Sequence, residues 1–135
     1  MAPSTKELFA VAQRGQSLED QLALLAPVEH VQPRDEEWAE AMALLAWMCR
    51  ATNDDATAIR CANLVVNTQP RGSVWRAQCE VLRAEIANRN REPIDTDGLV
   101  DAVQLLSTSA QLAAAYEGAF TLADAFCEAK KFAEA

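Results

Sequence analysis

Few residues in this chain have the types and spacing that chemistry requires. The single histidine, His30, cannot build a multi-histidine metal site, and no spacing places it beside a cysteine or serine nucleophile. The four glycines are scattered, and none precedes a Lys-Ser or Lys-Thr pair, so the sequence contains no phosphate-binding loop. These patterns predict a protein with no catalytic residues, no metal and no cofactor.

Acidic residues group where helices are expected to begin. Asp95-Thr96-Asp97-Gly98 superficially resembles a calcium loop, but the spacing to its glycine and to a distal glutamate does not fit. A loop that starts a helix is the better interpretation. Glu36, Glu37 and Glu40 lie at one helix entrance, where carboxylates favour the positive end of the helix dipole. We expect these carboxylates to be structural.

Four widely spaced cysteines lie inside apolar helical patterns: Cys49, Cys61, Cys79 and Cys127. Paired or metal-binding thiols usually cluster, so we expect small buried residues in a reducing compartment. The first residues, MAPSTKELF, contain no apolar run typical of a signal peptide. No segment approaches the roughly 18 uninterrupted apolar residues of a membrane span. The sequence therefore predicts a cytoplasmic protein without membrane insertion.

The chain of 135 residues is acidic, with 20 Asp and Glu against 12 Lys and Arg and a formal net charge of −8. Phosphate binding requires a basic surface, so nucleic acid is excluded as the expected ligand. The charge has two remaining interpretations. It promotes solubility, or it attracts a cationic partner.

Composition and chain breakers predict a single all-α domain over residues 1–135. Half of the residues are apolar, and Ala and unbranched side chains favour helix. Caps, Gly and Pro predict about seven helices, near residues 4–14, 17–27, 35–51, 55–68, 72–87, 99–107 and 108–128. Between them we expect a linker over 28–33, a polar loop over 88–98, and a turn at Lys130 into a stub that ends at Ala135.

Two matching apolar stripes suggest an internal repeat. Trp38 and Trp75 lie 37 residues apart, and each begins a series that advances by four, three and four residues. The members of the two series are Trp38, Met42, Leu45 and Cys49, and Trp75, Cys79, Leu82 and Ile86. Residues spaced in this way share one face of a helix, so we expect both stripes to be buried.

The segment Ala39–Pro70 resembles a tetratricopeptide repeat along its whole length. Met42 takes the large position, Leu45 and Ala46 the Leu-small pair, Cys49 the aromatic position, Asn53-Asp54 the turn, Ala58, Ile59 and Ala62 the second helix, and Pro70 the end. Met for Trp and Cys for Tyr are departures from the pattern.

Weaker matches to the same family lie on either side of this segment. Leu122-Ala123 with Phe126, Phe132 and Ala135 resembles the opening of a further pair, and Trp75, Cys79, Leu82, Ala102 and Leu106 resemble a middle one. The resemblance implies four parts, over residues 1–33, 34–70, 71–110 with a long loop, and 111–135. It implies a short right-handed stack of helix pairs, and a compact helical bundle is the alternative.

In this family the first helices of successive pairs line a concave surface. By register with the repeat, the resemblance places eight candidate partner-binding residues there: Glu40, Trp47, Arg50, Arg76, Glu80, Arg83, Phe120 and Asp124. Trp47 lies off the main stripe of its helix, and Trp and Arg contribute much interface energy. Packing of Trp47 under the N-terminal helices is the alternative.

The resulting hypothesis is an adaptor or chaperone-like module that binds a protein segment carrying both charges and an apolar anchor. One alternative is a small acidic inhibitor, of the immunity or antitoxin type, that masks a basic partner. Another is a purely structural oligomerisation subunit. An unfinished last hairpin would leave Phe126 and Phe132 short of cover, which suggests a homo-oligomer through the C-terminal helix.

Overall fold

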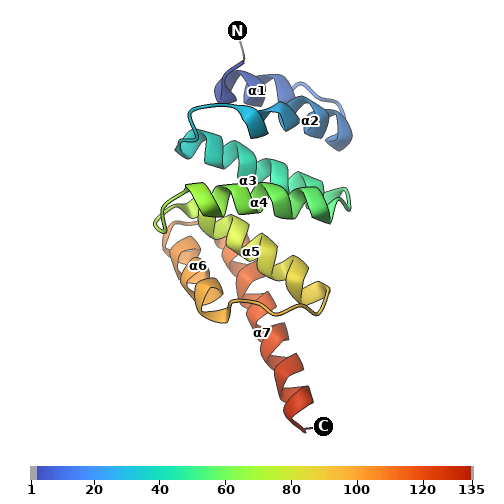
Figure 1. The fold of residues 1–135 in the computed structure, drawn as a ribbon, viewed down its shortest axis with the longest axis vertical. Coiled ribbons are helices and arrows are strands. Elements are labelled where there is room, and N and C mark those ends of the chain that lie inside the picture. Colours follow the sequence, from blue (N-terminus) through green and yellow to red (C-terminus); the bar gives the residue numbers. More distant parts are fainter. Residues whose placement is uncertain (1–2, 135) are drawn as a thin grey trace.

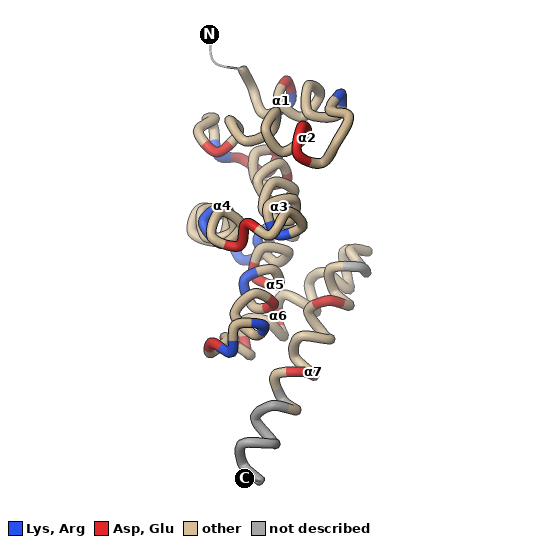
Figure 2. The backbone as a smooth tube through the Cα atoms, turned by 90° about the vertical axis from the view of Figure 1, so that its right-hand side faces the viewer, with Lys and Arg blue, Asp and Glu red and all other residues tan. Residues whose placement is uncertain are grey.

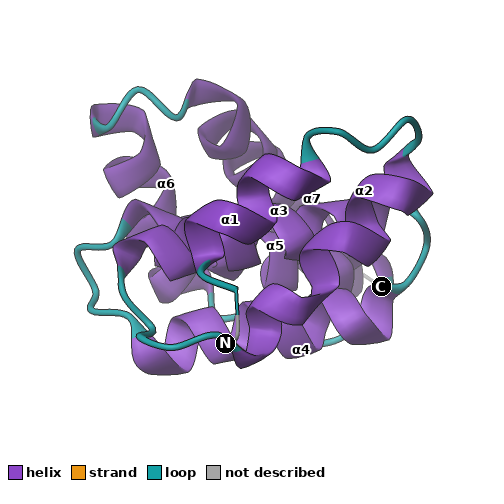
Figure 3. Ribbon diagram, turned by 90° about the horizontal axis from the view of Figure 1, so that it is seen from above, coloured by secondary structure: helices purple, strands orange, loops and turns teal. Residues whose placement is uncertain are grey.

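The computed structural model describes the backbone of residues 3–134 and most of their side chains. The side chains at 112, 113, 126 and 128–134, and with them the expected lack of cover at Phe126 and Phe132, lie outside the described residues. Over the part described, Figure 3 contains helices and loops but no strand. The predicted all-α fold with about seven helices is confirmed.

Seven α-helices and one 3-10 helix follow one another along the described chain (Figure 1). They are α1 (Thr5–Ala12), α2 (Leu18–Leu25), η1 (Ala26–His30), α3 (Glu36–Ala51), α4 (Asp55–Thr68), α5 (Val74–Arg89), α6 (Thr96–Thr108) and α7 (Leu112–Glu134).

The helices form an elongated stack in which each packs mainly against its neighbours in the sequence (Figures 1 and 2). Consecutive helices pack together from α3 to α7, and α5 also packs against both α3 and α7. The segments α1, α2 and η1 cover α3 at one end of the stack. No helix in the described chain combines the length and the apolar character that a bilayer span requires.

Side-chain caps define where the first six α-helices begin. In each case the residue before the helix accepts a hydrogen bond, of 2.9–3.3 Å, from the backbone N–H three residues later. The capping residues are Ser4, Ser17, Asp35, Asp54, Ser73 and Asp95. Replacing such a cap with Ala typically costs about 1 kcal/mol, so these six residues fix much of the helix pattern.

Three helices end in the same backbone motif. Asn53, Arg91 and Ala110 follow α3, α5 and α6 in the left-handed conformation, with φ of 65°, 59° and 61°. The N–H of the next residue then donates to a carbonyl five residues back, as from Asp54 to Cys49 at 2.8 Å. The motif turns the chain sharply, so each helix can be followed by one that packs back against it.

Two clusters of buried apolar side chains hold the stack together. The larger joins α1, α2, η1, α3, α4 and one face of α5, and it includes Trp38 and Met42, both with 0% exposure. The smaller joins α5, α6 and α7 and includes Val81 and Leu106. Trp47 is half-buried and packs against both clusters. The two apolar stripes predicted from the sequence are confirmed as core, although Trp75 is only half-buried.

Helix α5 belongs to both clusters because its side chains point in four directions. Successive residues are about 100° apart around a helix, so residues three or four apart share a face. The apolar face that meets α3 and α4 consists of Cys79, Leu82 and Ile86. The opposite apolar face, which meets α6 and α7, consists of Ala77, Val81 and Ala84. Of the two polar faces between them, one carries Arg76, Glu80 and Arg83, and the other carries Gln78 and Glu85.

Some helix boundaries differ from the prediction. Pro27, expected to end the second helix, lies in the first turn of η1, where the missing N–H of proline has no cost. Helix α6 begins at Thr96 rather than Leu99, because the Asp95 carboxylate accepts a hydrogen bond from Gly98 N–H at 3.0 Å. The expected loop over 88–98 is therefore reduced to residues 90–95, and this finding agrees with the helix-starting interpretation of these acidic residues.

The end of the chain also differs from the prediction. Thr108 does not cap α7, because it lies in the last turn of α6 and its hydroxyl donates to the Leu105 carbonyl at 3.0 Å. Helix α7 continues from Leu112 to Glu134, so the predicted turn at Lys130 is wrong. The stretch after Gly118 contains no Gly or Pro and is rich in Ala, which favours one uninterrupted helix.

Three of the four cysteines are buried, as predicted, and the fourth is not. Cys49, Cys61 and Cys79 lie in the larger cluster as free thiols, and burial raises the pKa of both Cys61 and Cys79 to about 12. Cys127 is exposed. The prediction fails there because Cys127 shares the outer face of α7 with Tyr116 and Phe120, which are each 78% exposed.

Candidate functional site

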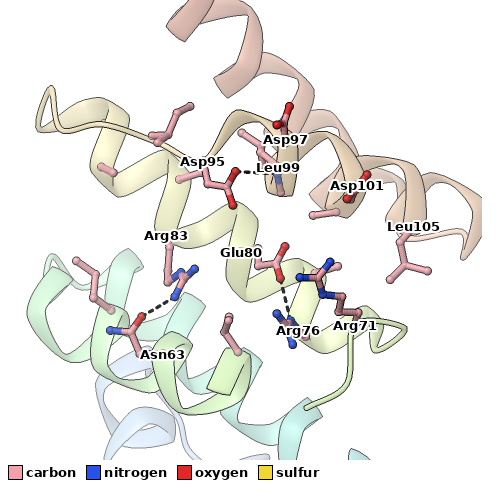
Figure 4. A pocket seen from close by; sticks show the side chains of 18 of the residues that line it. Asn63, Arg71, Arg76, Glu80, Arg83, Asp95, Asp97, Leu99, Asp101 and Leu105 are labelled. Atoms are coloured by element: carbon pink, nitrogen blue, oxygen red, sulfur yellow. Dashed lines mark hydrogen bonds and ion pairs between the residues drawn. The ribbon is translucent and has the colours of Figure 1, made fainter. Parts of the chain in front are cut away.

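A groove with a volume of about 710 Å³ runs along α5 between α4 and α6 (Figure 4). Helices α4 and α6 both pack against α5, and one polar face of α5 is left between them as a floor. The loop over residues 90–95 contributes to the α6 side. We call this hollow the α4–α6 groove.

The floor of the groove consists of Arg76, Glu80 and Arg83, which hydrogen bonds hold in place. Arg76 Nε donates to Glu80 Oε1 at 2.9 Å, and its Nη1 donates to the Gln69 carbonyl at 2.9 Å. Arg83 Nη1 donates to Asn63 Oδ1 on α4, also at 2.9 Å (Figure 4). The ion pair compensates Arg76, whereas the partner of Arg83 is neutral. Arg83 therefore contributes a net positive charge to the floor.

The α6 wall carries two acidic residues followed by an apolar one. Asp97, Asp101 and Leu105 are four residues apart and form one row along the groove (Figure 4). On the other side, α4 contributes Ile59 and Val66, which give that wall an apolar character. A bound group would thus meet carboxylates on one side and hydrocarbon on the other.

Most of the charges in the groove are not compensated within it. The lining includes three arginines and five carboxylates, and Arg76 with Glu80 forms the ion pair among them. In the part of the chain that the structure describes, no salt bridge involves the other six: Arg71, Arg83, Glu92, Asp95, Asp97 and Asp101. The groove thus presents two cations and four anions to a ligand.

A second polar cluster lies on the other polar face of α5, where α3 and α7 approach it. Arg50 on α3 forms ion pairs with Glu85 on α5 and, at 3.4 Å, with Glu117 on α7. The Arg50 guanidinium also stacks on the Trp47 ring, 4.6 Å from its centroid. One arginine therefore links three helices.

The surroundings of Glu85 raise the pKa of its carboxyl. Burial raises the pKa of this carboxyl, Arg50 opposes the shift, and the nearby Glu117 carboxylate adds to it. Because Arg50 is already engaged by Trp47 and two carboxylates, the cluster offers little to a ligand. We interpret it as a structural link between the stacked helices.

The eight candidate residues from the sequence do not lie on one continuous surface. Arg76, Glu80 and Arg83 line the α4–α6 groove, whereas Trp47 and Arg50 belong to the cluster on the other polar face of α5. The groove is walled by α4 and α6, the second helices of the expected pairs. The predicted surface used the first helices instead, so only the three α5 residues are common to both.

The remaining three candidates lie at the two ends of the stack. Glu40 is exposed and borders a shallow hollow shared with Lys6 and Phe9 of α1. Phe120 is 78% exposed on α7. Asp124 Oδ2, also on α7, accepts a hydrogen bond from Asn88 Nδ2 at 2.6 Å. These residues are too dispersed to act together with the groove.

Sequence reasoning missed the walls of the groove. Asn63 has no sequence signal, because it is one of several polar residues on α4 and forms no distinctive pattern. Asp97, Asp101 and Leu105 do have one, since their spacing of four residues predicts a common helix face. That pattern was hidden because the region was expected to be a loop up to Gly98.

The acidic residues of the groove are not grouped in the way that metal ligands are. Among the described residues, no group of three or more His, Cys, Asp or Glu is placed to hold a metal ion. The arrangement of an apolar lining with uncompensated charges is instead suited to binding another molecule. No protein-family model matches the chain, and neither a curated protein nor a solved structure is significantly similar to it.

Proposed function

We propose that this protein is a non-catalytic interaction module, of the adaptor or chaperone type, that binds a segment of another protein in the α4–α6 groove. The observation that carries the proposal is the combination of an apolar lining with charges of both signs that form no salt bridge inside the groove. Protein interfaces combine apolar contacts at their centre with polar contacts around it.

The lining has the residue types that favour such binding. Ile59, Val66 and Leu105 supply hydrocarbon, and Arg83 supplies a guanidinium held by Asn63. An arginine already fixed by a hydrogen bond loses less side-chain freedom when it binds a ligand. A segment with both charges and an apolar anchor would satisfy these groups together.

We further propose that α3–α4 and α5–α6 are tetratricopeptide-like pairs. The support is the sequence pattern of Ala39–Pro70, together with the tight turn at Asn53-Asp54 between two helices that pack on each other. In this proposal the segment would lie on the side of the second helices. This placement differs from the inner surface that the family resemblance implies.

Selection of displayed peptides would test the groove directly. Peptides from a random decapeptide library would be selected on the wild-type protein, and their affinities would then be measured for Ala87→Trp by fluorescence anisotropy. Ala87 is half-buried and lines the groove. An indole at this position would occupy the space that a ligand needs, so we expect affinity to fall at least tenfold.

The matched control is Ala119→Trp, which adds the same side chain at an exposed position on α7. This variant should bind the selected peptides as the wild type does, and circular dichroism should show equal helix content in all three proteins. Selected peptides that bind Ala87→Trp with unchanged affinity would contradict the proposed site.

Exposed aromatic side chains on α7 favour self-association as a second candidate function. Tyr116 and Phe120 are each 78% exposed and one helical turn apart. Together they would bury roughly 300 Å² of surface per chain. A standard interface buries about 800 Å² per partner, so the association would be weak. Light scattering over a range of concentrations should show a dimer that Phe120→Ser abolishes and Ala123→Ser retains. A strict monomer at every concentration would exclude this candidate.

A further inference from the structure

We infer that the partner of the α4–α6 groove is an extended basic segment, with cationic side chains at two alternate positions and an apolar side chain two residues later. The inference rests on the proposed function, because it names the class of partner for the same groove. The spacing of the α6 row, the length of the groove and the distribution of its charges support it.

The row on α6 matches the periodicity of an extended chain. Asp97, Asp101 and Leu105 advance by four residues, which corresponds to about 6 Å per step along the helix axis. In an extended segment, side chains on one face recur every two residues, or about 6.6 Å. An extended segment that runs along α6 would therefore place alternate side chains opposite these three residues in turn.

The length of the groove matches a short extended segment. The wall from Asp95 to Leu105 is about 15 Å long. Five extended residues span about 17 Å, so an extended pentapeptide would run along the whole wall, whereas a helix would need about ten residues to do so.

The charges explain why cations would occur at alternate positions. Asp97 and Asp101 have no salt-bridge partner in the described chain and would attract Lys or Arg. The intervening side chains would point away from α6 toward α4, the side on which Asn63 holds the uncompensated Arg83, which repels cations. A segment with adjacent cations would place one of them against this arginine, so repulsion selects the alternating pattern.

Blocked pentapeptides would test the inference. The probes are KSKSL, its isomer KKSSL and the acidic ESESL, each titrated into the 15N-labelled protein while the backbone amides of Gly72 and Gly98 are followed. Both glycines line the groove. We expect KSKSL to shift both amides and to bind at least tenfold more tightly than either of the other peptides.

Two doubly substituted proteins separate groove recognition from general charge attraction. Asp97→Asn with Asp101→Asn removes the acidic row, and affinity for KSKSL should fall at least tenfold. Glu19→Gln with Glu36→Gln removes the same charge from exposed positions outside the groove and should leave the affinity unchanged.

Any other ranking overturns the inference. Equal binding of KSKSL and KKSSL, or equal losses in the two double variants, would mean that net charge alone attracts the peptide. If none of the three probes shifts the groove amides, the partner is not a basic segment of this kind. Tight binding of ESESL in the groove would also overturn it. Neither of the last two results decides the proposed function, which the peptide selection and Ala87→Trp test separately.

Discussion

Gly118 lies where α7 packs closely against α5 and α6, and its substitution tests this packing. A Cβ atom at position 118 would lie 2.5 Å from Cγ2 of Val103 on α6 and 3.0 Å from Cγ2 of Val81 on α5. Favourable contacts between carbon atoms occur at about 3.5–4.0 Å. A single added methyl group is therefore too close by about 1 Å on the α6 side, and we expect Gly118→Ala to destabilise the protein.

The expected magnitude is the difference between two opposing effects. Replacing Gly with Ala inside a helix stabilises it by about 1 kcal/mol. Forcing an extra carbon into a packed core costs about 1–3 kcal/mol. Val81 and Val103 are β-branched and have stiff χ1 angles, and Val81 is fully buried, so neither methyl group can move away easily. The cost should lie in the upper part of that range, which gives a net loss of about 1–2 kcal/mol.

Urea denaturation followed by circular dichroism would measure this loss. Ala119→Gly, at the exposed neighbouring position, gives the contribution of helix propensity alone and should destabilise by about 1 kcal/mol. Adding Val103→Ala should relieve the clash, so the two core substitutions together should cost less than the sum of their separate effects. A Gly118→Ala variant as stable as the wild type, or more stable, would refute the close contact of α7 with α6.

Three further predictions concern the stability of the stack, each measured by urea denaturation. Trp38→Phe removes the 2.9 Å hydrogen bond from the buried indole to the η1 backbone and some core volume, so it should cost roughly 2 kcal/mol. The hydrogen bond from Arg60 lowers the pKa of Glu29 below 4.5. The stabilisation that this pair gives the folded protein is therefore complete above pH 4.5, and it is lost as the pH falls through the lower folded-state pKa. Glu29→Gln should therefore be less stable than the wild type at neutral pH, and the deficit should vanish in acid. Burial raises the pKa of Glu85 above 4.5. The contribution of the Glu85 carboxyl to the free energy of unfolding therefore falls as the pH rises from 4.5 through the folded-state pKa. Over this pH range, Glu85→Gln should gain stability relative to the wild type. Parallel pH profiles for the wild type and either variant would contradict the corresponding prediction.

Most of the fold could be predicted from the sequence because local patterns determine helix positions. The stripe that begins at Trp38 is buried as expected, and Ser17 and Asp35 cap the helices they were expected to start. The errors at the two ends of α6 occur where the deciding interaction is a single cap or end motif. Asp95 starts α6 a turn early, and the left-handed Ala110 ends it, although alanine rarely adopts that conformation.

The candidate site was only partly predictable because it depends on how three helices are oriented around α5. Register with the repeat pattern placed Arg76, Glu80 and Arg83 together on one face of their helix, and all three line the groove. The sequence could not show that α4 and α6, rather than α3 and α7, form the walls beside that face. The same limit applies to Trp47, which packs against both core clusters instead of lining a groove or lying only under the N-terminal helices.

Asp101 best distinguishes the two interpretations of the acidic charge. Asp97 lies in the first turn of α6, where a carboxylate stabilises the helix by about 0.3–1 kcal/mol, so a structural role could explain its presence. Asp101 lies beyond that turn, caps no helix and has no salt bridge in the described chain. If the acidic row binds a cationic segment, Asp101→Asn should weaken KSKSL binding and change stability by less than about 0.5 kcal/mol. Asp97→Asn should reduce both the affinity for KSKSL and the stability of the protein. If the charge serves solubility alone, Asp101→Asn should leave peptide binding unchanged, and that result would remove the physical basis for a basic partner.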